Sequence, residues 1–223
     1  DRSPSRGLGD VYKRQIMAMS AGRFFEWGEH DRAAKLFRRL IKLKPQDPVA
    51  YSNLSVCCGH ANRIDEAITL LRAALSIHPA YAFGWNNLGS AYKENARFDA
   101  AGVQFERAAC LDPDYAEAKF NVGNLSLLLG RFEEGWTLYE SGWLCGQRRP
   151  LRPLPGKAWK GDAALAGRSI LISLEQGLGD AIQMSRYFPL IQNQAERTYV
   201  EVQPSLRGLF ESCFSGIQWI TYG

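Results

Sequence analysis

Residues 175–180 combine acidic side chains with two glycines ahead of an expected helix, in the order Glu175, Gln176, Gly177, Leu178, Gly179 and Asp180. The two glycines allow a backbone to turn tightly and approach a ligand. The helix that follows would direct its free N–H groups and the positive end of its dipole toward the loop. Ile182 stands where a dinucleotide fingerprint needs its third glycine, so a dinucleotide site is not favoured. Asp180 would repel an anion, which makes it either a helix cap or a base facing a neutral hydroxyl group.

Three asparagines recur at a fixed spacing earlier in the chain. Asn53, Asn87 and Asn121 are 34 residues apart, and Met19 stands one period before them. An amide offers both a donor and an acceptor, so a row of amides can hold the main chain of an extended peptide without reading its sequence. The same side chains could instead be helix-surface asparagines that bond to water or to a neighbouring turn. The residues themselves favour neither interpretation.

A repeat of 34 residues positions these asparagines. Prolines 45, 79 and 113 share the spacing, and proline ends a helix because it lacks an N–H and crowds the preceding turn. Residues 82–115 contain Trp85, Leu88, Gly89, Tyr92, Ala101, Phe105, Ala108 and Pro113 at the offsets of the tetratricopeptide signature, which they resemble.

The resemblance implies helix-turn-helix units at 14–47, 48–81, 82–115 and 116–149, which form a solenoid over residues 16–148. Its groove would bind a peptide or protein ligand, with Asn53, Asn87 and Asn121 as the peptide-binding residues. The ladder is similar to the one that lines protein O-linked N-acetylglucosamine transferases.

The periodicity changes after a Pro-rich stretch, 149–156, which is typical of an extended linker. Strand-like runs at 169–174, 198–203 and 217–221 alternate with helical patterns at 180–192 and 205–214. This β-α-β-α-β order is typical of half a doubly wound parallel sheet. The expected fold class is therefore α + α/β, a tetratricopeptide solenoid followed by a partial Rossmann-like sheet domain.

The loop at 175–180 belongs to a longer pattern. Trp159 and Gly161 precede it, then a Leu-x-Gly-Arg run at 165–168, and Ile182, Gln183, Ser185, Arg186 and Tyr187 follow it. The pattern resembles bacterial tetratricopeptide proteins whose C-terminal part is similar to glycosyltransferases of the heptosyltransferase, two-Rossmann kind. The resemblance implies that residues 157–223 are the truncated N-terminal part of such a domain.

In that family a Gly-Asp step supplies the base for the acceptor hydroxyl, a role that falls here on Asp180. The resemblance makes Glu175, Gln176, Gly177, Gly179, Gln183 and Arg186 the substrate loop. A nucleotide sugar would be the donor in the full-length parent, held mainly by a second Rossmann domain. The fragment alone is then expected to bind no cofactor and to be inactive. The rival hypothesis is a non-catalytic interaction scaffold with a degenerate Rossmann-like domain.

The composition is that of an ordinary globular protein. The chain is 46% hydrophobic and 22% charged, and 27 basic against 23 acidic residues leave a net charge of +4. This charge gives no reason to expect a nucleic-acid partner, and no apolar run approaches the roughly 18–20 residues of a membrane span. Five cysteines without a CxxC pair favour a reducing, cytoplasmic location.

Two further expectations concern isolated features. His30, His60 and His78 lack a second ligand at i+4, so no metal site is expected. Residues 1–15 are polar and without periodicity, and we expect them to be a non-native or disordered tail.

Overall fold

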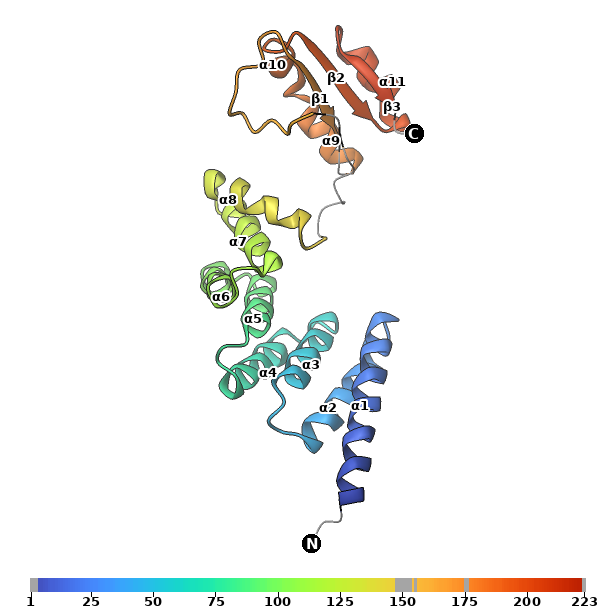
Figure 1. Cartoon of the computed structure of the whole chain (residues 1–223), viewed down its shortest axis with the longest axis vertical. Coiled ribbons are helices and arrows are strands. Elements are labelled where there is room, and N and C mark those ends of the chain that lie inside the picture. Colours follow the sequence, from blue (N-terminus) through green and yellow to red (C-terminus); the bar gives the residue numbers. More distant parts are fainter. Residues whose placement is uncertain (1–3, 147–153, 155, 175–176, 222–223) are drawn as a thin grey trace. The chain divides into compact units, whose positions relative to one another are not determined.

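The computed structural model describes residues 4–146, 154, 156–174 and 177–221. The chain divides into two compact units, Asp1–Pro150 and Leu151–Gly223 (Figure 1). The first unit is helical and the second contains a small parallel sheet. Most of the Pro-rich stretch 149–156 lies outside the described residues, which include only its positions 154 and 156.

The first unit consists of helices that pack as successive antiparallel pairs. The helices are α1 (Pro4–Glu26), α2 (His30–Leu43), α3 (Pro48–His60), α4 (Ile64–Ile77), α5 (Ala82–Glu94), α6 (Phe98–Leu111), α7 (Ala116–Leu128) and α8 (Phe132–Tyr139), followed by a 3₁₀ turn η1 (Glu140–Trp143). Pro45, Pro79 and Pro113 each stand two residues after the second helix of a pair, where a missing N–H ends the helix. The expected helical solenoid is confirmed.

Small residues let the two helices of a pair approach closely. A Cβ atom on Gly89 of α5 would lie 2.6 Å from the ring of Phe105 of α6, so glycine leaves the space that this ring occupies. Phe105 has no exposed surface, and neither have Ala101 and Ala108 on the same helix. The glycine, alanine and phenylalanine positions of the repeat therefore encode the close packing of one pair.

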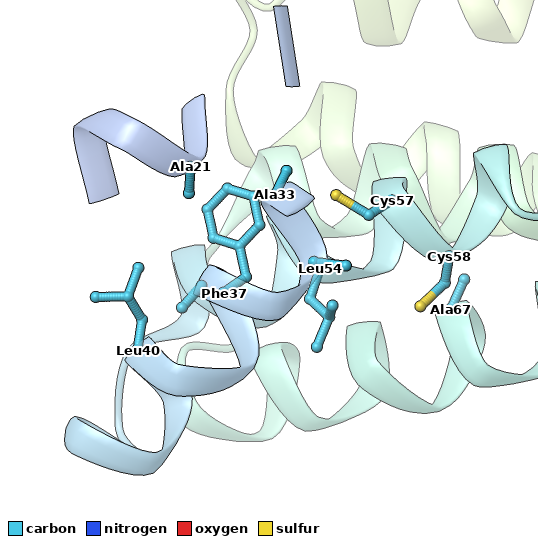
Figure 2. Close-up of a cluster of buried hydrophobic side chains, with 10 residues drawn as sticks. Ala21, Ala33, Phe37, Leu40, Leu54, Cys57, Cys58 and Ala67 are labelled. Atoms are coloured by element: carbon cyan, nitrogen blue, oxygen red, sulfur yellow. The ribbon is translucent and has the colours of Figure 1, made fainter. Parts of the chain in front are cut away.

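The core of the first two pairs is assembled from four helices. Phe37 of α2 packs with Ala21 of α1 and Leu54 of α3 (Figure 2). Cys57 and Cys58 of α3 are 1% and 0% exposed and belong to the same cluster. Burial raises the pKa of the Cys57 thiol to about 11, so both side chains act as small apolar groups in this core.

At the start of the chain the structure differs from what the sequence led us to expect. Helix α1 begins at Pro4 and includes most of the segment 1–15, where we expected a tail. The hydrogen bonds of a helix join residues four positions apart, so a helix can continue beyond the residues that pack against a neighbouring helix. Val11 is 43% and Tyr12 is 66% exposed, which is why no apolar periodicity marks this part of the helix in the sequence.

The second unit is a three-stranded parallel sheet with helices between its strands. Its elements are β1 (Ser169–Ser173), α9 (Leu178–Ser185), α10 (Phe188–Gln192), β2 (Arg197–Val202), α11 (Pro204–Cys213) and β3 (Gln218–Thr221). The strand order is β1-β2-β3, with Ile172 paired to Val200 and Val200 paired to Trp219. Val200 and Val202 are completely buried and pack with Phe188 and Phe210, so the helices cover this face of the sheet.

One helix of the second unit is broken where the sequence pattern predicts continuity. Residues 180–192 were expected to form one helix, but α9 ends at Ser185 and α10 begins at Phe188. Pro189 is the second residue of α10 and has no N–H to donate to the preceding turn. The break lets Phe188, which is 2% exposed, enter the core.

Candidate functional site

The three ladder asparagines lie on the first helices of consecutive pairs. Asn53 is on α3, Asn87 on α5 and Asn121 on α7, and each is half-buried. The Nδ2 atom of Asn87 donates to Ser52 Oγ at 3.1 Å. The Nδ2 atom of Asn121 donates in the same way to Asn86 Oδ1 at 2.8 Å. Both bonds span 35 residues, so each of these amides reaches back to the preceding repeat.

The acceptors of these bonds are residues that the sequence analysis did not single out. Ser52 is 0% and Asn86 is 1% exposed, and each immediately precedes a ladder asparagine. Asn86 also donates through Nδ2 to the hydroxyl of Tyr115 at 3.2 Å. Burial raises the pKa of the Tyr115 hydroxyl, and it raises the pKa of Tyr81, where a side-chain hydrogen bond with Ser52 partly offsets the rise.

This polar contact between repeats recurs with the period of the chain. Ser52 and Asn86, like Tyr81 and Tyr115, are 34 residues apart. The polar residues Ser52 and Asn86, each followed 29 positions later by a tyrosine, were the sequence signal that could have revealed it. Each Nδ2 group of Asn87 and Asn121 uses one of its two N–H donors between repeats, which leaves one donor and the acceptor Oδ1 for a ligand.

A cavity of about 520 Å³ opens beside Asn87, among α3, α4 and α5. Ala67 and Leu71 of α4 form a buried apolar floor. His60 at the end of α3 and Glu94 at the end of α5 lie at its exposed edge. Asn53 borders a second cavity, of about 360 Å³, among α1, α2 and α3. Two of the three ladder residues therefore line hollows large enough for a side chain of a ligand.

The second candidate site is the loop between β1 and α9. Gly177 is the N-cap residue of α9, and Asp180 lies exposed in the first turn of the helix. The backbone of Gly177 has φ −63° and ψ 168°, which other residues also adopt, so the turn itself does not need glycine there. A Cβ on Gly177 or Gly179 would meet no atom within 4 Å, so neither glycine is required by a close neighbour. A carboxylate in the first turn is stabilised by the helix dipole.

Of the remaining residues predicted for the substrate loop, the structure describes Gln183 and Arg186. Gln183 and Arg186 follow Asp180 at spacings of three residues along the chain, and all three are exposed. The guanidinium of Arg186 lies 4.9 Å from the centre of the Tyr187 ring and donates to its hydroxyl at 3.1 Å. Glu175 and Gln176, which were predicted to belong to the substrate loop, lie outside the described residues.

A buried carboxylate lies near the C-terminal ends of the strands, on the same side as the loop between β1 and α9. Glu201 of β2 is 3% exposed and is paired in register with Ser173 of β1. The Ser173 hydroxyl donates to Glu201 Oε2 at 2.9 Å. The sequence analysis missed this pair. An acidic residue inside an otherwise apolar strand could have indicated it, because a buried carboxylate needs a hydrogen-bond partner. The pair lies at the carboxyl ends of parallel strands, where α/β sheets bind their ligands.

The three histidines lie at the ends of helices or in the turns between them. His30 and His60 stack with ring centres 4.0 Å apart, and His78 lies in the turn after α4. Over the described part of the chain, no group of three or more His, Cys, Asp or Glu side chains could hold a metal ion. A search of the same residues finds no helix with the length and apolar character that crossing a membrane requires.

The repeats define the class of the first unit. Family models of the tetratricopeptide repeat match residues 24–84 and 86–142, which include the helix pairs with the 34-residue period. The first unit is therefore a tetratricopeptide repeat domain.

Individual relatives agree with this class. Protein FlbA of Caulobacter vibrioides is 32% identical over 96 residues, which are 41% of this chain and 16% of FlbA, so the chain spans about a sixth of that protein. Among solved structures, TTC0263 of Thermus thermophilus is 20% identical with a TM-score of 0.55, over 60% of this chain and 75% of its own. MamA is 17% identical with a TM-score of 0.52, over 63% and 82% of the two chains.

A third structure is similar over almost its whole length. The first tetratricopeptide domain of Spaghetti (RPAP3), bound to the HSP90 peptide SRMEEVD, is 19% identical with a TM-score of 0.50, over 53% of this chain and 94% of its own. At these identities the structural matches show the fold.

Proposed function

We propose that the repeat domain is a protein-interaction scaffold that docks an extended peptide along α3, α5 and α7. The observation that carries the proposal is the regular use of Nδ2 in Asn87 and Asn121, which fixes each amide against the preceding repeat. Their Oδ1 atoms then offer acceptors for peptide N–H groups at a constant spacing. The peptide complex of the RPAP3 domain, which has the same fold, supports a ligand of this kind.

A peptide selection tests the scaffold. Random linear peptides displayed on phage are selected on the immobilised chain, and a selected peptide is titrated against the variant in which Asn53, Asn87 and Asn121 are all alanine. We expect weaker binding by the variant and a modest loss of stability, because two part-buried bonds between repeats are removed. Asn193→Ala, which changes an exposed asparagine of the second unit, is the matched control. Unchanged affinity of the triple variant would refute the role of the asparagines.

For the second unit, we propose the N-terminal part of a glycosyltransferase-like Rossmann domain. Its parallel β-α-β-α-β arrangement with strand order β1-β2-β3 is that of half a doubly wound sheet. In the complete protein this domain transfers a sugar from a nucleotide sugar to a hydroxyl acceptor, and Asp180 takes the acceptor proton. The exposed carboxylate of Asp180 in the first turn of α9 is the observation that supports this role.

The enzymatic part is tested with the complete gene product. We expect turnover of a nucleotide sugar, and a decrease of about a hundredfold or more in Asp180→Asn, because general-base catalysis contributes about this much. Asn has nearly the same shape, and Asp180 is not the N-cap residue, so the variant keeps its stability. Absence of turnover by the complete protein with any nucleotide sugar would favour the non-catalytic scaffold.

A further inference from the structure

The cavity beside Asn87 has an apolar floor and a polar edge. Ala67 and Leu71 of α4 and Ala91 of α5 are at most 6% exposed and line its interior. Glu94 and Asn87 of α5 lie at its edge. A volume of about 520 Å³ is more than one long side chain needs. The cavity therefore suits a side chain with an apolar stem and a polar end.

The charges at the edge of the cavity are acidic. Among the described residues that line it, none is lysine or arginine, His60 is the one basic side chain, and Glu94 is the one carboxylate. Glu94 has no ion-pair partner in the described part of the chain. Arg63, the N-cap residue of α4, donates to Glu66 at 2.9 Å, and Glu66 also accepts from Arg38 at 3.1 Å. Both nearby arginines therefore share Glu66, whose one carboxylate offsets one of their two positive charges.

Helix ends add to this negative potential. Helix α3 ends at His60 and α5 ends at Glu94, and both residues line the cavity. The C-terminus of a helix carries a partial negative charge because its last carbonyl groups lack partners in the helix. Helix α4 begins beside the cavity, but Asp65 in its first turn opposes the positive end of its dipole.

We propose that this cavity binds a lysine or arginine side chain of the docked peptide. The alkyl part of that side chain covers Ala67 and Leu71, and its cationic end pairs with Glu94 and faces the ends of α3 and α5. Ligands of this domain are therefore peptides with a basic anchor residue. This inference rests on the proposed peptide scaffold, and it adds the chemistry of the ligand.

The peptide selection described above provides the first test. Selected sequences should be enriched in lysine or arginine at one position, and the enrichment should disappear when Glu94→Gln is the bait. Selected peptides without a basic anchor would overturn this inference and leave the scaffold proposal standing. A selection that yields no binding peptide would contradict the scaffold proposal itself.

A double-mutant cycle locates the charge contact. One selected peptide is compared with its counterpart in which norleucine replaces the anchor lysine, on the wild-type chain and on Glu94→Gln. Loss of the ammonium group should weaken binding by about fivefold on the wild type, the size expected for a partly exposed ion pair, and by little on Glu94→Gln. Glu106→Gln, an exposed carboxylate of α6 away from the cavity, is the control. Equal losses on the wild type and on Glu94→Gln would overturn the pairing.

A third variant blocks the cavity without removing charge. A Cβ on Gly59 of α3 would lie 3.8 Å from Glu94 Oε2, an ordinary contact, so a side chain is accommodated there. Gly59→Met places a long side chain across the cavity edge, whereas Gly59→Ala leaves the cavity open. We expect binding to be lost in Gly59→Met and retained in Gly59→Ala, with both variants at least as stable as the wild type, because both residues form helices better than glycine. Normal binding by Gly59→Met would refute the location.

Discussion

Replacing Gly123 by alanine places a methyl group where the backbones of α7 and α8 touch. A Cβ on Gly123 would lie 2.7 Å from the backbone nitrogen of Tyr139 and 2.9 Å from the carbonyl carbon of Leu138. Ordinary contact begins at 3.4 Å, so α8 must withdraw by 3.4 − 2.7 = 0.7 Å. Backbone atoms cannot rotate aside as the end of a side chain can, so the whole helix has to move.

The expected cost follows from two opposing effects. Overpacking of this kind costs about 1–3 kcal/mol, while alanine in place of glycine inside a helix contributes about 0.5–1 kcal/mol of stability. Gly123→Ala should therefore lower the free energy of unfolding by roughly 0–2.5 kcal/mol, in contrast to a gain. Gly22→Ala in α1 is the matched control, because a Cβ there meets no atom within 4 Å. The control should raise stability by about 0.5–1 kcal/mol.

Urea unfolding followed by circular dichroism compares the two variants. Hydrogen exchange of the α7 and α8 amides shows whether the loss is local, since the units of a repeat domain can unfold separately. If Gly123→Ala gains stability as Gly22→Ala does, the two helices do not approach each other as closely as the structure shows, and the reasoning is wrong.

Three further outcomes follow from buried or paired groups. Asn86→Leu should lower the free energy of unfolding by about 1–3 kcal/mol, measured by urea unfolding, because Asn86 is buried and its half-buried partners Tyr115 and Asn121 lose their hydrogen bonds; an unchanged value would contradict the contact between repeats. A thiol reagent, followed by mass spectrometry, should modify exposed Cys110 in the folded chain but reach Cys57, whose pKa burial raises to about 11, only on unfolding. The hydrogen bond from Arg38 lowers the pKa of the Glu66 carboxyl group from its ordinary value of 4.5. The contribution of this Arg38–Glu66 pair to stability is therefore complete above pH 4.5 and is lost as the pH falls through the lowered pKa. Melting temperatures across this acidic range should fall less steeply in Arg38→Gln, and identical slopes would show that the pair is not formed.

The sequence by itself determined the repeat architecture. The helix pairs, their 34-residue period and the prolines that end them follow from local rules, because periodicity and missing donors act within a few residues along the chain. Gly89 and Phe105 of one pair were likewise evident, since their spacing belongs to the repeat signature. The alternation of strands and helices after residue 168 predicted a parallel sheet, which the structure contains.

Only the tertiary structure decided what the polar residues contact. Asn121 bonds to Asn86 across 35 residues, and this depends on how one repeat stacks on the next, which no local pattern encodes. The ends of α3 and α5 line the same cavity, and only this arrangement places Glu94 at the edge of a binding cavity. Long-range contacts are set by the packing of whole elements, so a side chain's partners emerge only once the helices are placed against each other.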